Sequence, residues 1–179
     1  QGIGRGIINI ENIPLYEDEI GPFGSTTSDT PRTMVTENTK KILLFIVCFG
    51  SSCKEENEGE ADAIIELVKT LLDEGNKHTN MAVITPYRKQ VRLLRAKAQE
   101  VIDMNECPLI DTVERLQGQD VDCIIISFAS SDEDYIKSVY DFIFNRNRLN
   151  VMISRAKTKV LIFGCNFIQK ELKEKIFLN

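Results

Sequence analysis

Two arginines near the end of the sequence have no carboxylate partner close by in the chain. Arg148 and Arg155 are seven residues apart, and neither has an Asp or Glu within four positions. On a helix that spacing places both on one edge. A guanidinium at the margin of a core can bind phosphate oxygens in a bidentate way, and it can equally form a tertiary salt bridge, for which Glu114 and Asp120 are the candidates. This segment therefore indicates anion binding or an internal ion pair.

A second arginine group lies in the middle of the chain. Arg88, Arg92 and Arg95 follow one another at intervals of four and three residues, and Gln99 continues the series. On a helix they form one stripe beside the apolar face, where like charges four residues apart repel each other. The stripe needs either an outside anion, such as a phosphate backbone, or the carboxylates of the acidic segment 58–74.

The charges of the whole chain are arranged unevenly. The net charge is −5, which argues against a protein that is basic all over. Eight carboxylates fall within residues 55–74, whereas residues 75–99 and 142–170 contain no Asp or Glu at all. This pattern favours a one-sided surface for an anion, although a solvated charged face balanced by acids elsewhere would give the same pattern.

Apolar runs alternate with amphipathic segments from residue 41 onward. The patterns predict strands at 42–49, 81–85, 109–113, 121–128 and 159–163, and helices at 57–74, 87–104, 145–157 and 166–177. Asn57 with Glu60 three residues later has the spacing of a capping box, in which the Glu side chain returns to the cap residue, and Pro86 suits the first turn of the next helix. This alternation predicts an α/β fold, an open and mainly parallel sheet with helices on both faces and with ligands beyond the carboxyl ends of its strands. Residues 1–40, rich in Gly, Pro, Ser and Thr, are expected to form an irregular N-terminal arm or insertion, and residues 41–179 one domain.

Composition excludes several other classes. The five cysteines are odd in number and none is spaced C-x-x-C, while His78 is the only histidine, so neither a His-based catalytic triad nor a metal site is expected. The longest apolar run, eight residues from Ile42, is far shorter than the roughly 20 needed to cross a bilayer. We expect no membrane association and an intracellular, reducing location.

Three segments read together resemble a known pattern. They are Ile84 to Gln90 (ITPYRKQ), Thr112 to Asp120 (TVERLQGQD) before an apolar strand, and Arg148 to Lys157 (RLNVMISRAK). In this order and spacing they resemble the second RecA-like domain of superfamily 1 helicases, in the branch that contains the nonsense-mediated-decay and Dna2-type enzymes. The resemblance is close over residues 81–164 and looser from residue 42. It implies a P-loop NTPase-like fold that lacks its own P-loop.

The resemblance also implies a nucleotide site. In this family ATP with Mg²⁺ is bound mainly by a first RecA-like domain, and the arginine at the position of Arg155 reaches the γ-phosphate as an arginine finger. Arg148 matches a second arginine of the same motif, and Gln117, Gly118 and Asp120 match the Q-G-[RK]-E turn near the nucleotide. Here Asp120 replaces the usual Glu, a departure from the family's pattern, and Gly118 is expected to serve the turn itself.

The other implied partner is single-stranded DNA or RNA. In the family the strand runs over both RecA-like domains, past the positions of Thr85, Pro86 and Thr112, and the stripe of Arg88, Arg92 and Arg95 would add phosphate contacts. Tyr87 could stack a base, but it falls on the apolar stripe and is expected in the core. Movement in the 5′ to 3′ direction is likewise implied by the resemblance alone, and the residues do not separate DNA from RNA.

Missing motifs leave two main hypotheses. The sequence has no G-x-x-x-x-G-K-[ST] loop, so it would hold only half of an ATP site and be inactive by itself, as a piece of a longer ATP-dependent helicase. The alternative is a non-catalytic RecA-like module that binds nucleic acid or protein. An unrelated flavodoxin-like or Rossmann protein is disfavoured, because no glycine fingerprint follows any predicted strand.

Overall fold

A single twisted sheet forms the centre of the molecule. The computed structural model describes residues 13–14, 42–48, 52–116 and 118–177. The strands are β1 (Ile13–Pro14), β2 (Ile42–Val47), β3 (Met81–Ile84), β4 (Leu109–Asp111), β5 (Val121–Ser127) and β6 (Ala156–Gly164), in the order β1-β2-β6-β5-β3-β4. Strands β2 to β6 are all parallel, and β1 pairs antiparallel with β2. The predicted α/β fold with a parallel sheet is confirmed.

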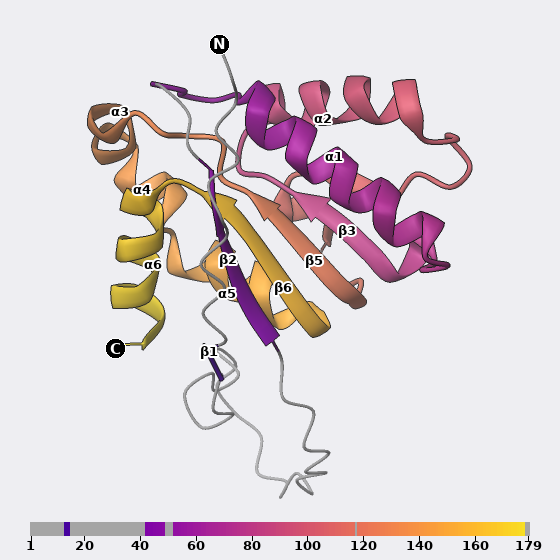
Figure 1. Ribbon diagram of the computed structural model, residues 1–179. Coiled ribbons are helices and arrows are strands. Elements are labelled where there is room, and N and C mark those ends of the chain that lie inside the picture. Colours follow the sequence, from indigo (N-terminus) through magenta and orange to yellow (C-terminus); the bar gives the residue numbers. More distant parts are fainter. Residues whose placement is uncertain (1–12, 15–41, 49–51, 117, 178–179) are drawn as a thin grey trace, which may run out of the picture.

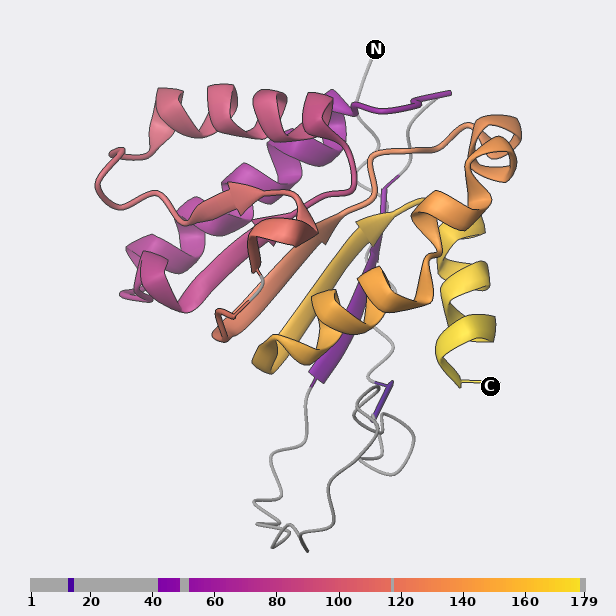
Figure 2. The ribbon, with the colours of Figure 1, turned by 180° about the vertical axis from the view of Figure 1, so that it is seen from behind.

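Helices cover both faces of the sheet (Figures 1 and 2). Helices α1 (Glu58–Asp73) and α2 (Arg88–Val101) pack on one face, and α3 (Glu133–Ser138), α4 (Tyr140–Ile143), α5 (Arg146–Ser154) and α6 (Asn166–Phe177) on the other. Two short 3-10 helices, η1 (His78–Asn80) and η2 (Val113–Leu116), lie in connections. Within one strand the alternation is direct: Met81 and Val83 face α1 and α2, while Ala82 and Ile84 face the opposite layer.

The start of α1 forms as expected except for one side chain. Asn57 is the N-cap and accepts a hydrogen bond from the Glu60 amide, as the capping-box spacing predicted. The expectation that the Glu60 side chain returns to the cap is wrong, because its carboxylate is buried and faces the loop after β5. Gly75 ends the helix with a φ of +90°, a conformation that suits glycine.

The boundary between α5 and β6 differs from the prediction. The helix ends at Ser154, Arg155 caps it, and β6 begins at Ala156. The predicted helix therefore ran too far, because pairing of Ala156 with Val121 of β5 takes those residues into the sheet. Arg155 thus lies at the end of the packed helix and not within it.

Two further differences concern connections. Helices α3 and α4 were not predicted, since this stretch is short and has no extended amphipathic period. Pro86 was expected in the first turn of a helix, but α2 starts two residues later with Tyr87 as its N-cap. Apart from β1, the predicted arm at residues 1–40 lies outside the described residues.

Candidate functional site

Arg155 and Asp120 form an ion pair at the amino edge of the sheet. Arg155 follows α5 and precedes β6, and Asp120 immediately precedes β5, the neighbouring strand. The Arg155 Nη1 donates to Asp120 Oδ1 over 3.1 Å, and the Val121 amide donates to the Arg155 carbonyl over 3.0 Å. The two parallel strands therefore bring together residues that are 35 positions apart in the sequence.

This pair is partly open to solvent. The side chains are 35% exposed for Arg155 and 56% for Asp120, so the salt bridge contributes little to stability. The Nε of Arg155 is buried and has no hydrogen-bond partner among the described residues. An unsatisfied buried donor is costly, and an anion can be contacted only by the part of the guanidinium that stays accessible. The residues present thus suit a phosphate group.

Arg148 makes a separate pair near the other end of α5. Its Nη2 lies 3.0 Å from Glu114 Oε1 in η2, and its guanidinium lies over the ring of Phe142 at 4.4 Å from the centroid. Although partial burial acts to raise it, the pKa of Glu114 is lowered by a hydrogen bond with Thr112 and by the charges of Arg148 and Arg88. Both carboxylates named as alternative partners in the sequence are therefore engaged, each by a different arginine.

The turn before Asp120 is described only in part. Gly118 is exposed and has a φ of +84°, so its expected role in the backbone of the turn is confirmed. Gln117 lies outside the described residues.

The residues predicted to contact single-stranded nucleic acid lie at the opposite edge of the sheet, where the β-strands have their carboxyl ends. Thr85 follows β3 and is fully buried, and its Oγ1 accepts a hydrogen bond from the Tyr87 amide over 3.3 Å. Pro86 and Thr112 are half-buried. Of these three, Thr85 has its hydroxyl turned inward, so a phosphate contact there would fall to the other two or to backbone groups. Tyr87 is buried, as expected.

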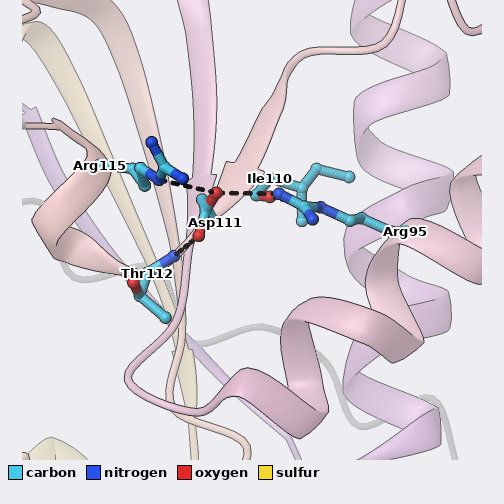
Figure 3. A network of polar contacts seen from close by, with 5 residues as sticks. All are labelled: Arg95, Ile110, Asp111, Thr112 and Arg115. Atoms are coloured by element: carbon cyan, nitrogen blue, oxygen red, sulfur yellow. Dashed lines mark hydrogen bonds and ion pairs between the residues drawn. The ribbon is translucent and has the colours of Figure 1, made fainter.

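The arginine stripe of α2 divides into two parts. Arg95 donates to the Ile110 carbonyl and to Asp111 Oδ2, each over 2.9 Å, and Arg115 lies 3.8 Å from the same carboxylate oxygen (Figure 3). Asp111, and not the acidic segment 58–74, is thus the partner of Arg95. Arg88 and Arg92 are exposed, and no ion pair among the described residues includes either of them.

A buried polar network at the carboxyl edge was missed by sequence reasoning. Glu60 Oε1 accepts hydrogen bonds from Ser127 Oγ over 2.6 Å and from the Ala129 amide over 2.9 Å. Gln90 Nε2 donates to the same Ser127 hydroxyl over 3.0 Å. Burial raises the pKa of Glu60 to about 7, although the hydrogen bonds from Ser127 and Ala129 act to lower it. Only the Asn57 to Glu60 spacing hinted at the site, and it indicated a helix cap.

The network fixes the loops that follow the strands. The Asn57 amide donates to Gln90 Oε1 over 2.8 Å, and Ser130 Oγ contacts the Tyr87 hydroxyl over 3.0 Å. Ala129 holds a φ of 58° where it meets Glu60. All the buried polar side chains of the described residues belong to this edge of the sheet: Asn57, Glu60, Thr85, Gln90, Ser127 and Ser130. Such groups are retained where their positions matter or their hydrogen bonds are complete.

Comparison with known families gives the class of the chain. A family described as "AAA domain" matches residues 5–166, most of the chain, and the chain belongs to this family. "DNA replication ATP-dependent helicase/nuclease JHS1" of Arabidopsis thaliana is 28% identical over 89% of this chain and 13% of its own length. "DNA replication ATP-dependent helicase/nuclease DNA2" of Homo sapiens is 32% identical over 91% of this chain and 16% of its own. "Probable RNA helicase armi" of Drosophila melanogaster is 38% identical over 47% of this chain and 7% of its own.

These matches confirm the expected likeness to the C-terminal RecA-like domain of Dna2-type superfamily 1 helicases. The chain spans 13% and 16% of the length of the two helicase/nucleases. Among solved structures, the C-terminal domain of a possible DNA helicase from Lactobacillus plantarum matches 63% of this chain and 70% of its own, with a TM-score of 0.45 at 14% identity. Within the described residues, no helix has the length and apolarity of a membrane span.

Proposed function

We propose that this chain is the C-terminal motor domain of an ATP-dependent helicase and supplies Arg155 as an arginine finger to ATP held mainly by another RecA-like domain. The observation that supports the finger is the Arg155 guanidinium itself, which is partly exposed, loosely paired with Asp120 and incompletely hydrogen-bonded at Nε. A permanently charged, planar donor of this kind stabilises the negative charge that grows during phosphoryl transfer.

The remaining nucleotide assignments follow from the same arrangement. Asp120 would hold Arg155 in place before ATP binds and face the nucleotide afterwards, and Gln117 and Gly118, which precede it in the sequence, would also contact the nucleotide. ATP, bound together with Mg²⁺, would be the substrate, and this chain would place positive charge beside its triphosphate. We assign Mg²⁺ to the other domain, along with the P-loop. By itself the chain is expected to hydrolyse no ATP.

Single-stranded nucleic acid is the proposed second partner. Arg88 and Arg92 are exposed cations of α2 without ion pairs among the described residues. Arg88 is two positions after Pro86, and Thr112 follows β4, which pairs with β3. Phosphate contacts from such groups carry affinity but no sequence preference. Closure of the cleft on ATP and its opening after hydrolysis would turn this binding into stepping along the nucleic acid, in the 5′ to 3′ direction by likeness to the family.

Two further expectations stay predictions: the division into an arm at residues 1–40 and a domain at residues 41–179, and an intracellular location.

A non-catalytic binding module is the second candidate. The ion pairs Arg155–Asp120 and Arg148–Glu114 favour it, because both arginines have partners without any nucleotide. The two candidates differ in what happens when the finger is removed from the parent protein.

The decisive experiment is Arg155→Ala in the parent protein. We expect kcat for ATP hydrolysis to fall by about 10³-fold or more, because the finger acts mainly in the transition state. Lys157→Ala, which removes an exposed charge two residues away, is the matched control and should retain turnover. Normal turnover with Arg155→Ala, or a parent without ATPase activity, would support the binding module instead.

A further inference from the structure

Phe142 exposes its ring at the carboxyl edge of the sheet. It is the aromatic member of the exposed large apolar side chains among the described residues, with 39% of its surface accessible; the others are Val101 and Met104. An isolated exposed Phe needs no explanation. Phe142 is not isolated, because charged and aromatic neighbours hold its ring in place.

Two contacts fix the orientation of this ring. The Arg148 guanidinium lies 4.4 Å from its centroid, and the Tyr87 ring lies 5.8 Å away at an interplanar angle of 41°. Arg148 is itself held by Glu114 at 3.0 Å. The Tyr87 ring in turn lies 6.4 Å from the Tyr135 ring, measured between centroids, and its hydroxyl accepts a hydrogen bond from Ser130. The Phe142 ring and the Arg148 plane are therefore positioned before any ligand arrives.

Charges of both signs surround the ring: Arg88, Arg148 and Lys54 are cations, and Glu114 and Glu55 are carboxylates. Arg88, the first residue of α2, lies close enough to Glu114 to lower its pKa together with Arg148. Lys54 lies over the Tyr135 ring at 5.9 Å from its centroid. The amide of the packed Tyr87 also donates to the Oγ1 of Thr85, the residue after β3. A polyanion that follows the carboxyl edge would pass the exposed ring.

We propose that Phe142 and Arg148 form a stacking platform for a base of single-stranded nucleic acid. Aromatic rings and guanidinium planes both stack on bases, and stacking tolerates any base sequence. This assignment places Arg148 with the strand, near the opposite end of α5 from Arg155, and not with the phosphates of ATP. It rests on the proposed binding of a single strand by this domain.

The sequence provides a direct probe, because it contains no Trp. In the full chain, Phe142→Trp introduces a single indole at the platform, and Met104→Trp introduces one at an exposed control position beyond the far end of α2. Addition of oligothymidylate at low salt should quench the fluorescence of the indole at position 142 and leave that of the indole at position 104 unchanged. Affinity measured by anisotropy of a labelled oligothymidylate should fall about tenfold in Phe142→Leu and be retained in Phe142→Tyr, because only Leu lacks a ring.

The outcomes separate this inference from the function on which it rests. Strand binding without quenching of the indole at position 142, or equal affinity of the Leu and wild-type chains, would overturn the platform and leave strand binding by the domain intact. Quenching by ATP in place of the strand would assign the ring to the nucleotide and also overturn it. Absence of oligothymidylate binding by the wild-type chain would refute both proposals.

Discussion

The guanidinium of Arg155 reaches Asp120 across the amino ends of two adjacent parallel strands, at a distance of 3.1 Å. The candidate contacts to single-stranded nucleic acid, Thr85, Pro86 and Thr112, lie at the other edge of the sheet, where β3 and β4 end. Ligands of open α/β sheets are expected beyond the carboxyl ends of the strands. Because α5 runs back from the carboxyl edge, it places Arg148 and Arg155 at different edges of the molecule.

The Arg155–Asp120 pair predicts an effect on catalysis without a comparable effect on stability. Asp120→Asn should change the free energy of unfolding by about 1 kcal/mol or less, because the pair is partly exposed. In the parent protein it should lower kcat for ATP hydrolysis by about tenfold to a hundredfold, since Arg155 loses the group that orients it.

Urea titration and steady-state ATPase assays check the two effects. Glu114→Gln removes the carboxylate of the other arginine pair and serves as the matched control, with kcat for ATP hydrolysis little changed. An unchanged kcat in Asp120→Asn would show that Asp120 does not position the finger.

The arginines of α2 should differ in their contribution to strand binding. Replacing Arg88 and Arg92 with Ala should flatten the plot of log affinity against log salt concentration, by about 0.7 for each phosphate that the variant no longer binds. Arg95→Ala should leave that slope nearly unchanged and lower stability by about 1 kcal/mol or less, because its guanidinium is used by Ile110 and Asp111 and is half exposed. Equal slopes for wild type and the double variant would assign the whole stripe to structure.

Because Glu60 is buried and its pKa is raised, we expect the free energy of unfolding to depend on pH. Its folded-state pKa of about 7 lies above the ordinary value of 4.5, so the folded chain holds this proton more tightly than the unfolded chain does. The resulting contribution to stability is fully present below pH 4.5 and is lost progressively as the pH rises to about 7. The charge of Glu60 also acts on Cys48, which follows β2: burial and this charge together raise the pKa of that thiol.

Glu60→Gln should remove this contribution to the pH dependence. Urea titrations between about pH 5 and pH 8 should show a smaller loss of stability in the variant than in the wild-type chain. Exposed Glu58 on the same helix offers a control, since Glu58→Gln should keep the wild-type slope. If Glu60→Gln also keeps that slope, Glu60 does not titrate in this range.

Much of the architecture followed from local pattern. Apolar runs such as Ile42–Val47 and Val121–Ser127 form strands of the sheet, and Asn57 and Gly75 bound α1 as their chemistry predicts. These features depend on residues within a few positions of each other. The α5–β6 boundary did not follow, because it is set by the pairing of Ala156 with Val121, which lies on another strand far earlier in the chain.

By itself, the sequence determined the parallel α/β fold, the family and the identity of the arginines that could bind anions, since spacing and residue type suffice for those. Only the tertiary structure decided which carboxylate each arginine holds, that Thr85 is buried, and that the Glu60 carboxylate accepts a hydrogen bond from Ser127, which also accepts one from Gln90. These relationships join residues far apart in the chain, and only the packing of helices on the sheet brings their side chains within hydrogen-bonding distance.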